Sequence, residues 1–299
     1  MNGIVVLDKP AGPPSNHVLG RLKRLLGVPK MGFLGTLDPL ASGVLPVFVG
    51  KATKLIAVFE GLEKEYRLAL LLGVRTDTFD AEGQVVEERE TGHLAAEEVR
   101  AAVLAFRGRY LQKVPPYSAV KVGGVPAYRL ARRGQTVPLR ERTVELRELE
   151  IEELALPRVA LRVVGSAGTY MRSLAEDIGH RTGVGAHLTE LRRTRCGDLF
   201  TLGNSVTLQQ VKEGLQQGDL GFLLNPAEFL RDHHPVVFAE SSESRIRDGQ
   251  SVPLGHSEEP PEPDAKIKAL RPCGSLIAIG KTVLLPGEVT GFRATKVLI

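Results

Sequence analysis

Apolar residues recur along this chain with two different spacings, and the spacing predicts which segments are strands and which are helices. Between Lys64 and Leu72 the apolar residues alternate, so this segment is expected to be a strand with Tyr66 on its apolar face. Apolar residues recur at helical spacing in residues 94–106 and again after Thr169, which can cap the second helix. Because strands and helices alternate irregularly, we predict an α+β fold built on a mixed sheet. The other expected elements are strands at 4–7, 44–49, 85–86, 143–153 and 159–165, and helices at 15–27, 52–60 and 128–133.

Prolines and glycines modify this pattern at a few positions. Pro46 lies inside an expected strand, and because proline has no backbone N–H, it predicts an edge strand or a bulge. Gly179 is expected near the end of the helix that follows Thr169. Residues 73–83 are predicted to form a polar loop, and residues 114–119 an extended connector.

The sequence changes character near His233-His234-Pro235. The residues that follow form short β-like runs separated by glycine, proline and charged turns. This pattern is typical of a small barrel or sandwich. We therefore predict a larger domain at residues 1–232 and a small β domain at residues 235–299.

Composition excludes some classes of protein. The chain has 299 residues, 42% hydrophobic and 25% charged, which is ordinary for a globular protein with a sizeable core. It contains no apolar run of about 18 residues and no export signal at its start, so neither a membrane span nor secretion is expected. Cys196 and Cys273 are far apart, which indicates a reducing compartment, and we expect a cytoplasmic protein.

Positive charge is clustered along the chain, whereas the net charge of +4 is mild. Each cluster alone is typical of a solvated helix face or loop. Several clusters in one chain favour a nucleic-acid partner. The basic clusters lie at 21–24, 129–133, 140–142 and 191–195, and residues 258–264 form an acidic, proline-rich patch.

Asp38 is the first candidate for chemistry, because it lies in a bend rich in glycine. Local rules explain it as a helix N-cap, with Pro39 at the first helical position and Gly43 closing a single turn. Alternatively, Gly32, Gly35 and Gly43 leave room for a bulky ligand to approach the backbone closely. These residues alone leave both interpretations open.

The sequence contains no recognisable metal or nucleotide-cofactor motif. Its histidines lack the spacing that places two imidazoles on one helix face, so a zinc site is not expected. Asp77, Asp80 and Glu82 have the wrong spacing for a calcium loop. No phosphate-binding glycine loop follows a strand. Asp38 would therefore act as a bare carboxylate, either as a nucleophile or as a general base.

Arg172 and Tyr66 each have an ordinary explanation and a functional one. If Thr169 is the cap, Arg172 lies in the first helical turn, where the helix dipole disfavours a cation by about 0.3–1 kcal/mol. An anionic partner is therefore expected, either Glu176 one turn further or Asp38. Tyr66 is either a core residue or a surface on which a planar ligand stacks.

Several motifs together resemble the bacterial tRNA pseudouridine-55 synthases, the TruB family. They run from the N-terminus to about residue 200 in the family's order. The matching segments are LDKPAG (7–12), GTLDPLASGVLP (35–46), KEY (64–66), RTDTFD (75–80), PPYSA (115–119), GTYMR (168–172) and LTELRR (188–193). The resemblance implies a pseudouridine-synthase-like mixed sheet with flanking helices, followed by a small PUA-like RNA-binding domain.

This family isomerises one uridine in the T-loop of tRNA, at position 55, without a cofactor or a metal. The resemblance therefore implies an isomerase that binds the T-arm of tRNA and flips the target base out of its stack. Asp38 would be the nucleophile, and Arg172 would keep it ionised and oriented. Tyr66 would stack on the base and assist removal of its carbon 5 proton. A monomer that does not contact a membrane is expected on the same ground.

The resemblance also implies a set of substrate-binding residues and shows one departure. The family reads Gly-His-Thr-Gly where this chain has Phe33-Leu34, and Phe33 can stack on RNA but offers no hydrogen bond. Asp80 matches a position in the hydrogen-bond network of the active site, and the basic clusters would meet phosphates. The other residues implied to support the site or contact RNA are Lys9, Lys64, Tyr170, Leu191 and Arg193.

Two rival functions fit some of the same residues. A tRNA-binding or tRNA-folding protein with an idle catalytic loop would explain the altered pair Phe33-Leu34. A carboxylate-dependent glycoside or phosphate hydrolase would need a second essential acid near Asp38, and Asp77 or Asp80 would supply it. The motifs favour the RNA-modifying enzyme over both.

Overall fold

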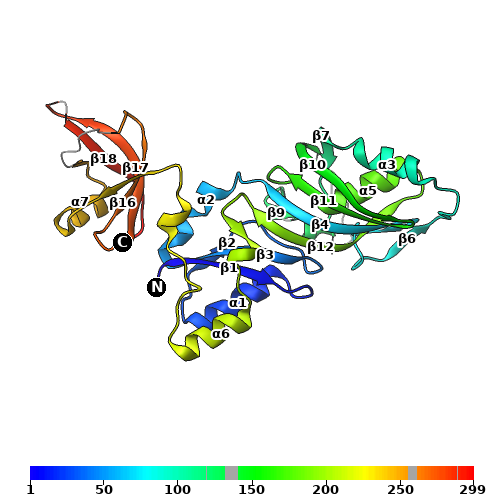
Figure 1. The fold of residues 1–299 in the computed structure, drawn as a ribbon, viewed down its shortest axis with the longest axis horizontal. Helices are drawn as coiled ribbons and strands as arrows, with labels where there is room; N and C mark the ends of the chain where they lie inside the picture. The colour runs from blue at the N-terminus through cyan, green and yellow to red at the C-terminus, as the bar shows by residue number, and fades with distance from the viewer. Residues whose placement is uncertain (119, 132–140, 255–260, 288) are drawn as a thin grey trace.

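A mixed sheet of nine strands forms the centre of the fold in this computed structural model (Figure 1). The structure describes residues 1–118, 120–131, 141–254, 261–287 and 289–299. The strands follow the order β1-β3-β12-β4-β11-β10-β7, while β2 pairs with β3 and β13 with β12. Only the β3–β12 pair is parallel among the described strands of this sheet. The strands are β1 (Gly3–Lys9), β2 (Met31–Phe33), β3 (Ser42–Val49), β4 (Lys64–Leu72), β7 (Gly108–Lys113), β10 (Glu141–Ala155), β11 (Arg158–Gly165), β12 (Ala186–Cys196) and β13 (Phe200–Thr201).

Two groups of helices cover the sheet. The helices α3 (Ala96–Leu104) and α5 (Met171–Thr182) lie together at the end that carries β7, and α1 (Ser15–Leu26) and α6 (Leu208–Gln217) lie together beside β1 (Figure 1). Their apolar residues join those of the strands in one large buried cluster. Within the described part of the chain, we find no helix with the length and apolar character needed to cross a membrane.

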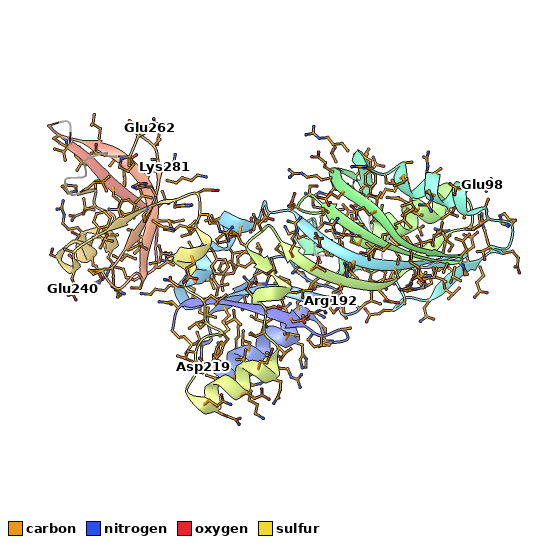
Figure 2. The ribbon with its side chains drawn as sticks, in the orientation of Figure 1. Glu98, Arg192, Asp219, Glu240, Glu262 and Lys281 are labelled. Atoms are coloured by element: carbon orange, nitrogen blue, oxygen red, sulfur yellow. The ribbon has the colours of Figure 1, made fainter. Side chains whose placement is uncertain are left out.

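Short elements fill the connections between these helices and strands. The hairpin β5–β6 occupies much of the segment predicted as a polar loop. Charged side chains such as Glu98 and Asp219 project outward from the connections and helices around the sheet (Figure 2). The short elements are β5 (Val74–Thr76), β6 (Val85–Glu88), β8 (Lys121–Val122), β9 (Val125–Pro126), α2 (Ile56–Phe59), α4 (Ala127–Ala131) and the 3-10 turns η1 (Gly50–Leu55), η2 (Leu202–Asn204) and η3 (Pro226–Phe229).

The α+β class with a mixed sheet, predicted from the sequence, is confirmed. The alternation in β4 does place Tyr66, Leu68 and Leu70 on a buried face. The apolar pattern misses β7 and β12, because polar residues occupy many of their positions. The basic cluster at 191–195 lies in β12, between β3 and β4, so its interpretation as a solvated helix face or loop is wrong.

Pro46 lies in an internal strand without a bulge, so the prediction of an edge or a bulge is wrong. On one side, β3 pairs with β1 throughout, and Pro46 lies opposite Val6. On the other side, β3 pairs first with β12 and then with β2. Pro46 falls in the gap between these two partners, where its missing N–H leaves no neighbour unpaired, and its carbonyl accepts from the Leu34 N–H at 2.9 Å.

The start of helix α5 differs from its prediction, whereas Gly179 lies near the end of the helix as expected. Its N-cap residue is Tyr170, whereas the Thr169 hydroxyl donates to the Ser166 carbonyl at 2.9 Å. The helix continues past Gly179 and ends at Gly183, which adopts the left-handed conformation with φ of 79°. Parts of other predicted segments lie outside the described residues, namely 119, 132–134, 140 and 258–260.

The C-terminal residues form a separate five-stranded sheet in the order β14-β16-β17-β18-β15. Phe238, Ile246 and Phe292 contribute to a hydrophobic core of its own. The small β fold expected there is confirmed, and its first strand begins at His234, while the exact domain limits stay a prediction. The elements are β14 (His234–Val237), η4 (Glu240–Ser242), α7 (Glu243–Arg247), β15 (Val252–Pro253), β16 (Lys266–Leu270), β17 (Leu276–Leu285) and β18 (Val289–Val297).

The two sheets meet through a shared apolar cluster. The rings of Phe200, from β13, and Phe229, from the connector η3, stack with centroids 4.9 Å apart and planes 9° apart. Leu276 and Ile279 of β17 belong to the same buried cluster. The C-terminal sheet therefore covers apolar side chains of the larger part.

Gly179 allows α5 to pack tightly on the start of β12, and this contact can be tested. A Cβ at Gly179 would lie 2.0 Å from the Ala186 nitrogen. Gly179→Ala should therefore lower the free energy of unfolding by about 1–3 kcal/mol, as overpacking does. Gly20→Ala is the control, because Gly20 is also inside a helix and the added Cβ meets no atom within 4 Å. This variant should raise the free energy of unfolding by about 0.5–1 kcal/mol. Equal effects in urea unfolding would contradict the proposed contact.

Candidate active site

A pocket of about 900 Å³ brings together segments that are distant in the sequence. The loop at 34–39 forms one wall, and the loop between β5 and β6 forms another. The central strands β4 and β12 and the start of α5 also contribute. Of the residues singled out in the sequence, the pocket is lined by Asp38, Lys64, Tyr66, Asp80, Tyr170, Leu191, Arg172 and Arg193 but not by Lys9 or Phe33.

No helix follows Asp38, so its interpretation as a helix N-cap is wrong. The chain makes only a turn there, in which the Ala41 N–H donates to the Asp38 carbonyl at 3.1 Å, before β3 begins. Other parts of the protein occupy the space where a side chain at these glycines would lie, although Gly35 also lines the pocket. A Cβ at Gly43 would lie 2.1 Å from the Arg193 carbonyl oxygen, and one at Gly35 would lie 3.1 Å from the Arg193 guanidinium. These glycines admit β12 and its arginine close to the loop.

Two buried side chains hold the Asp38 loop from beneath. The Lys9 ammonium donates to the carbonyls of Pro10, Pro39 and Ala41 at 2.9, 3.2 and 2.6 Å. Burial lowers the pKa of Lys9 to about 8, while the negative charges of nearby carboxylates act in the opposite direction. Ser15, to which the sequence gave no role at the site, donates to the Leu37 carbonyl at 2.6 Å and accepts its N–H at 3.0 Å.

Arg193 holds the same loop from the side of the sheet. It is 1% exposed, and its guanidinium donates to the carbonyls of Val44 at 2.7 Å and Gly35 at 2.9 Å. The register of β12 against β4 places Arg193 opposite Tyr66. All these donors point to backbone of the protein, so the described geometry favours loop support over a phosphate contact.

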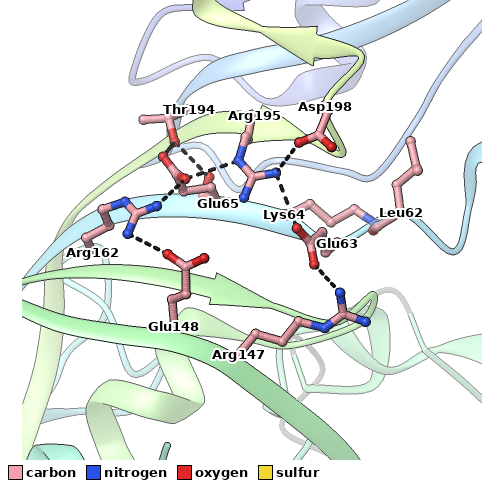
Figure 3. Close-up of polar contacts among 10 residues, drawn as sticks. All are labelled: Leu62, Glu63, Lys64, Glu65, Arg147, Glu148, Arg162, Thr194, Arg195 and Asp198. Atoms are coloured by element: carbon pink, nitrogen blue, oxygen red, sulfur yellow. Dashed lines mark hydrogen bonds and ion pairs between the residues drawn. The ribbon is translucent and has the colours of Figure 1, made fainter. Parts of the chain in front are cut away.

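The neighbouring basic residues of β12 are engaged by carboxylates. Arg195 contacts Glu63, Glu65 and Asp198 at 2.9–3.2 Å, and Arg162 of β11 extends the network on the same face of the sheet (Figure 3). Arg192 lies 2.8 Å from Asp8. This part of the sequence-predicted basic cluster is therefore largely neutralised within the protein.

Arg172 connects three loops around the pocket. Its Nε donates to Asp38 Oδ2 at 2.9 Å, Nη1 to the Thr78 carbonyl at 3.1 Å, and Nη2 to the Tyr117 carbonyl at 2.9 Å. The pairing of Arg172 with Asp38, one of two alternatives predicted from the sequence, is present. The other candidate, Glu176, instead pairs with Arg75 at 2.6 Å.

A second carboxylate, that of Asp80, lies near the same nitrogen of Arg172. Asp80 Oδ2 is 3.6 Å from the Nε of Arg172, and the side chain is 5% exposed, compared with 36% for Asp38. The Thr78 hydroxyl and the Glu82 N–H donate to Asp80 Oδ1 at 2.6 and 3.1 Å. Asp80 is thus buried and hydrogen-bonded, while Asp38 is the more open carboxylate of the pair.

Glu82 also lines the pocket, although sequence reasoning gave it no role there. Burial raises the pKa of Glu82, and the negative charge of Asp80 adds to this effect. A signal was present in the sequence, since Glu82 follows the matched segment 75–80 by two residues. Its significance depends on the bend of the β5–β6 hairpin, which the sequence did not show.

Tyr66 lines the pocket from the third position of β4. Burial raises the pKa of Tyr66, and the Arg193 guanidinium acts in the opposite direction. The phenol is therefore neutral at ordinary pH. Leu191, two residues before Arg193 in β12, lines the same pocket.

The remaining predicted residues have supporting positions. The Lys64 ammonium donates to the carbonyls of Leu62 at 2.5 Å and Glu60 at 3.3 Å, and burial lowers its pKa. Tyr170 lines the pocket as the N-cap residue of α5. Phe33 ends β2 and packs against the main apolar cluster. The described residues contain no group of three or more His, Cys, Asp or Glu side chains arranged to hold a metal ion.

Known protein families match most of the chain. The N-terminal domain of TruB family pseudouridylate synthases matches residues 23–171, and the tRNA pseudouridylate synthase B C-terminal domain matches residues 172–230. The chain belongs to the TruB family. It is therefore a pseudouridine synthase, an isomerase of uridine in RNA, and its substrates are tRNAs.

Relatives named tRNA pseudouridine synthase B resemble this TruB-family chain along most of its length. The protein of Syntrophus aciditrophicus is 41% identical over 286 residues, which are 94% of this chain and 91% of that protein. The protein of Geobacter sulfurreducens is 42% identical over 250 residues, 83% of this chain and 82% of that protein. The protein of Burkholderia pseudomallei is 46% identical over 266 residues, 89% of this chain and 86% of that protein.

Solved structures extend the likeness to the C-terminal sheet. A structure of an H/ACA RNP bound to a substrate RNA containing 2′-deoxyuridine superposes with a TM-score of 0.70 and 25% identity, covering 99% of this chain and 85% of that one. A Cbf5-Nop10-Gar1 complex gives a TM-score of 0.69 and 27% identity, with 99% and 85% covered. The fold of this TruB-family enzyme is thus that of a pseudouridine synthase with a PUA-like sheet.

The geometry of Arg172 predicts that its planar fork, and not only its charge, is needed. Arg172→Lys removes donors to the carbonyls of Thr78 and Tyr117, and a point charge cannot replace the fork. We expect kcat for pseudouridine formation to fall by about a hundredfold or more, while the Kd for a T-arm RNA stays within about threefold. Filter binding and single-turnover assays measure the two quantities. Parallel losses of binding and rate would contradict the assignment.

Proposed function

We propose that this enzyme converts uridine 55 in the T-loop of tRNA to pseudouridine, with Asp38 as the nucleophile acting on a flipped nucleotide. The observation that carries the proposal is the pairing of Asp38 with Arg172 in a pocket where Asp38 is the more exposed carboxylate. The ion pair with Arg172 orients the carboxylate of Asp38. Its remaining oxygen is available to an incoming sugar.

The reaction is an isomerisation, so no atom is added in the balance. The bond between uracil N1 and ribose C1′ breaks, and a bond between uracil C5 and C1′ forms. The proton on C5 is lost, and N1 ends with a proton. Asp38 supplies an electron pair that stabilises or traps the sugar carbon while the base turns.

Tyr66 and Leu191 are suited to hold the base during that turn. Both line the pocket, Tyr66 from β4 and Leu191 from the adjacent β12. A tyrosine ring stacks on a planar base, and a leucine can close the other side. Because burial raises the pKa of Tyr66, the neutral hydroxyl would assist removal of the C5 proton as a hydrogen-bonding group rather than as a phenolate.

The uridine has to leave its stack before it reaches Asp38. Flipping a base costs a few kcal/mol, and contacts in the pocket have to offset that cost. The pocket volume of about 900 Å³ lies in the range of ligand-binding sites. Stacking on Tyr66 and contacts to the RNA backbone around the pocket would provide the compensation. The monomeric state and the cytoplasmic location remain predictions.

Arg142 is the residue of the predicted basic clusters best placed to meet a phosphate. Its guanidinium lies close to Gly168, which lines the pocket. A Cβ added at Gly168 would lie 2.1 Å from Arg142 Nη1. It is exposed, and among the described residues no carboxylate pairs with it, whereas Arg195 has three such partners. Its Nη1 donates to the Gly168 carbonyl at 3.4 Å, a long contact that leaves the exposed guanidinium able to bind RNA.

This contrast gives a salt-dependence test. Arg142→Ala should weaken binding of a T-arm RNA and reduce the slope of log Kd against log salt by about one. Arg195→Ala removes the same charge from a neutralised position, and its slope should match the wild type. Binding titrations from low to moderate salt measure both slopes. The idea is wrong if Arg195→Ala lowers the slope as much as Arg142→Ala.

The central test of the proposed function is removal of the Asp38 charge. Asp38→Asn keeps the shape but not the nucleophile, so tritium release from carbon-5-labelled uridine in a T-arm transcript should fall by about a thousandfold or more. Asp77→Asn is the matched control, because Asp77 also lines the pocket but its Oδ1 accepts the Gln84 N–H at 2.8 Å. This control should retain most activity.

The same experiment separates the rival functions. A tRNA-binding protein with an idle loop would release no tritium even as the wild type. A hydrolase with Asp38 and Asp77 as paired acids would lose activity equally in both variants, and would cleave a sugar or phosphate ester without forming pseudouridine. Mapping of modified positions in the product RNA identifies uridine 55 as the target or excludes it.

A further inference from the structure

Gln112 is a fully buried polar residue that the mechanism above does not use. It lies on β7, at the end of the sheet, where β10 is the only neighbouring strand among the described strands. It does not line the pocket. Sequence reasoning missed it because β7 itself was not predicted.

The side-chain amide of Gln112 binds both backbone groups of Tyr170. Its Oε1 accepts the Tyr170 N–H at 2.8 Å, and its Nε2 donates to the Tyr170 carbonyl at 3.0 Å. The same Nε2 also donates to the hydroxyl of Tyr110. Because Tyr170 presents one donor and one acceptor, only one orientation of the amide satisfies both, and its placement is fixed.

This anchor holds the first turn of α5 where nothing local does. Tyr170 is the N-cap residue, its side chain makes no capping hydrogen bond, and the first turn contains no acidic residue. Ser173 directly follows Arg172, and its hydroxyl donates to the Lys113 carbonyl of β7 at 2.7 Å. The backbone on both sides of Arg172 is therefore tied to β7.

The position of this turn determines which carboxylate accepts the hydrogen bond from the Nε of Arg172. The Nε of Arg172 carries a single hydrogen, and it lies 2.9 Å from Asp38 and 3.6 Å from Asp80. A shift of the helix start by less than 1 Å would exchange the shorter contact for the longer. Misplacement on that scale can reduce a rate by about a hundredfold without changing binding.

We propose that Gln112 is a positioning residue for catalysis, which fixes the N-terminus of α5 so that Arg172 is bonded to Asp38 rather than shared with Asp80. Gln112 contacts neither substrate nor the reacting atoms and acts through Tyr170 and Arg172. The inference rests on the proposed function, because it is read out through pseudouridine formation.

The test compares two variants of the full-length enzyme on a T-arm transcript. Gln112→Met keeps an unbranched side chain of similar length but removes every hydrogen bond, and kcat should fall by about 10- to 100-fold with KM and RNA Kd within about threefold of wild type. Gln112→Glu keeps an oxygen for the Tyr170 N–H, and should lose less, about 3- to 10-fold in kcat. A crystal structure of either variant should show a longer Arg172 Nε to Asp38 distance.

Thr207→Ala is the control for lost stability alone. The Thr207 hydroxyl caps α6 and accepts the Gln210 N–H at 3.2 Å, in a helix that does not line the pocket. This variant should lower Tm and leave kcat unchanged. The proposal is overturned if either Gln112 variant folds with wild-type kcat, if kcat and KM change together, or if Thr207→Ala loses kcat equally. Should Gln112→Met fail to fold, Gln112→Glu alone decides. An inactive wild type would instead refute the proposed function.

Discussion

The ion pair between Arg172 and Asp38 is the interaction on which the site depends. Arg172 is buried in the first turn of a helix, a position that opposes a cation through both desolvation and the helix dipole. It is stable there because one carboxylate at 2.9 Å and two backbone carbonyls take its hydrogens. Those partners come from three separate loops, so the contact that orients Asp38 also assembles the pocket wall.

Other buried cations extend this arrangement. Lys9 and Arg193 direct their donors at backbone carbonyls of the Asp38 loop. A loop whose carbonyls are held in this way has little freedom to collapse when a polyanion approaches. The positive charges of Lys9 and Arg193, beside Asp38, are therefore buried and committed to structure. Net charge does not distinguish such buried cations from exposed ones.

The extent to which sequence predicts this site differs from residue to residue. Tyr66 could be placed on a buried face because alternation in β4 is regular, and Asp38 could be singled out by its surroundings and motif. Arg172 could be assigned an anionic partner by helix electrostatics, but the choice between Asp38 and Glu176 depends on tertiary contact. Only the fold shows that Arg75 engages Glu176.

Strands with mixed polarity escaped prediction for a physical reason. β12 lies between two strands, yet it carries Thr194 and Arg195, which both bond to the Glu65 carboxylate on β4 (Figure 3). Apolar periodicity detects residues buried among apolar side chains. It cannot detect residues that are buried by pairing with side chains of opposite charge. The same gap hid β7 and with it Gln112. The glycines near Asp38 were noticed correctly, but Arg193 occupies the space beside Gly35 and Gly43, and Ile56 the space beside Gly32.

The stacked rings of Phe200 and Phe229 have a consequence for how this enzyme can be divided. They belong to a buried cluster that includes leucine and isoleucine side chains from the C-terminal sheet. A chain cut before His234 would expose that cluster to water. The shortened protein would then carry an exposed apolar patch that promotes aggregation. The orientation of the C-terminal sheet relative to the pocket is thus set by side chains that both parts bury together.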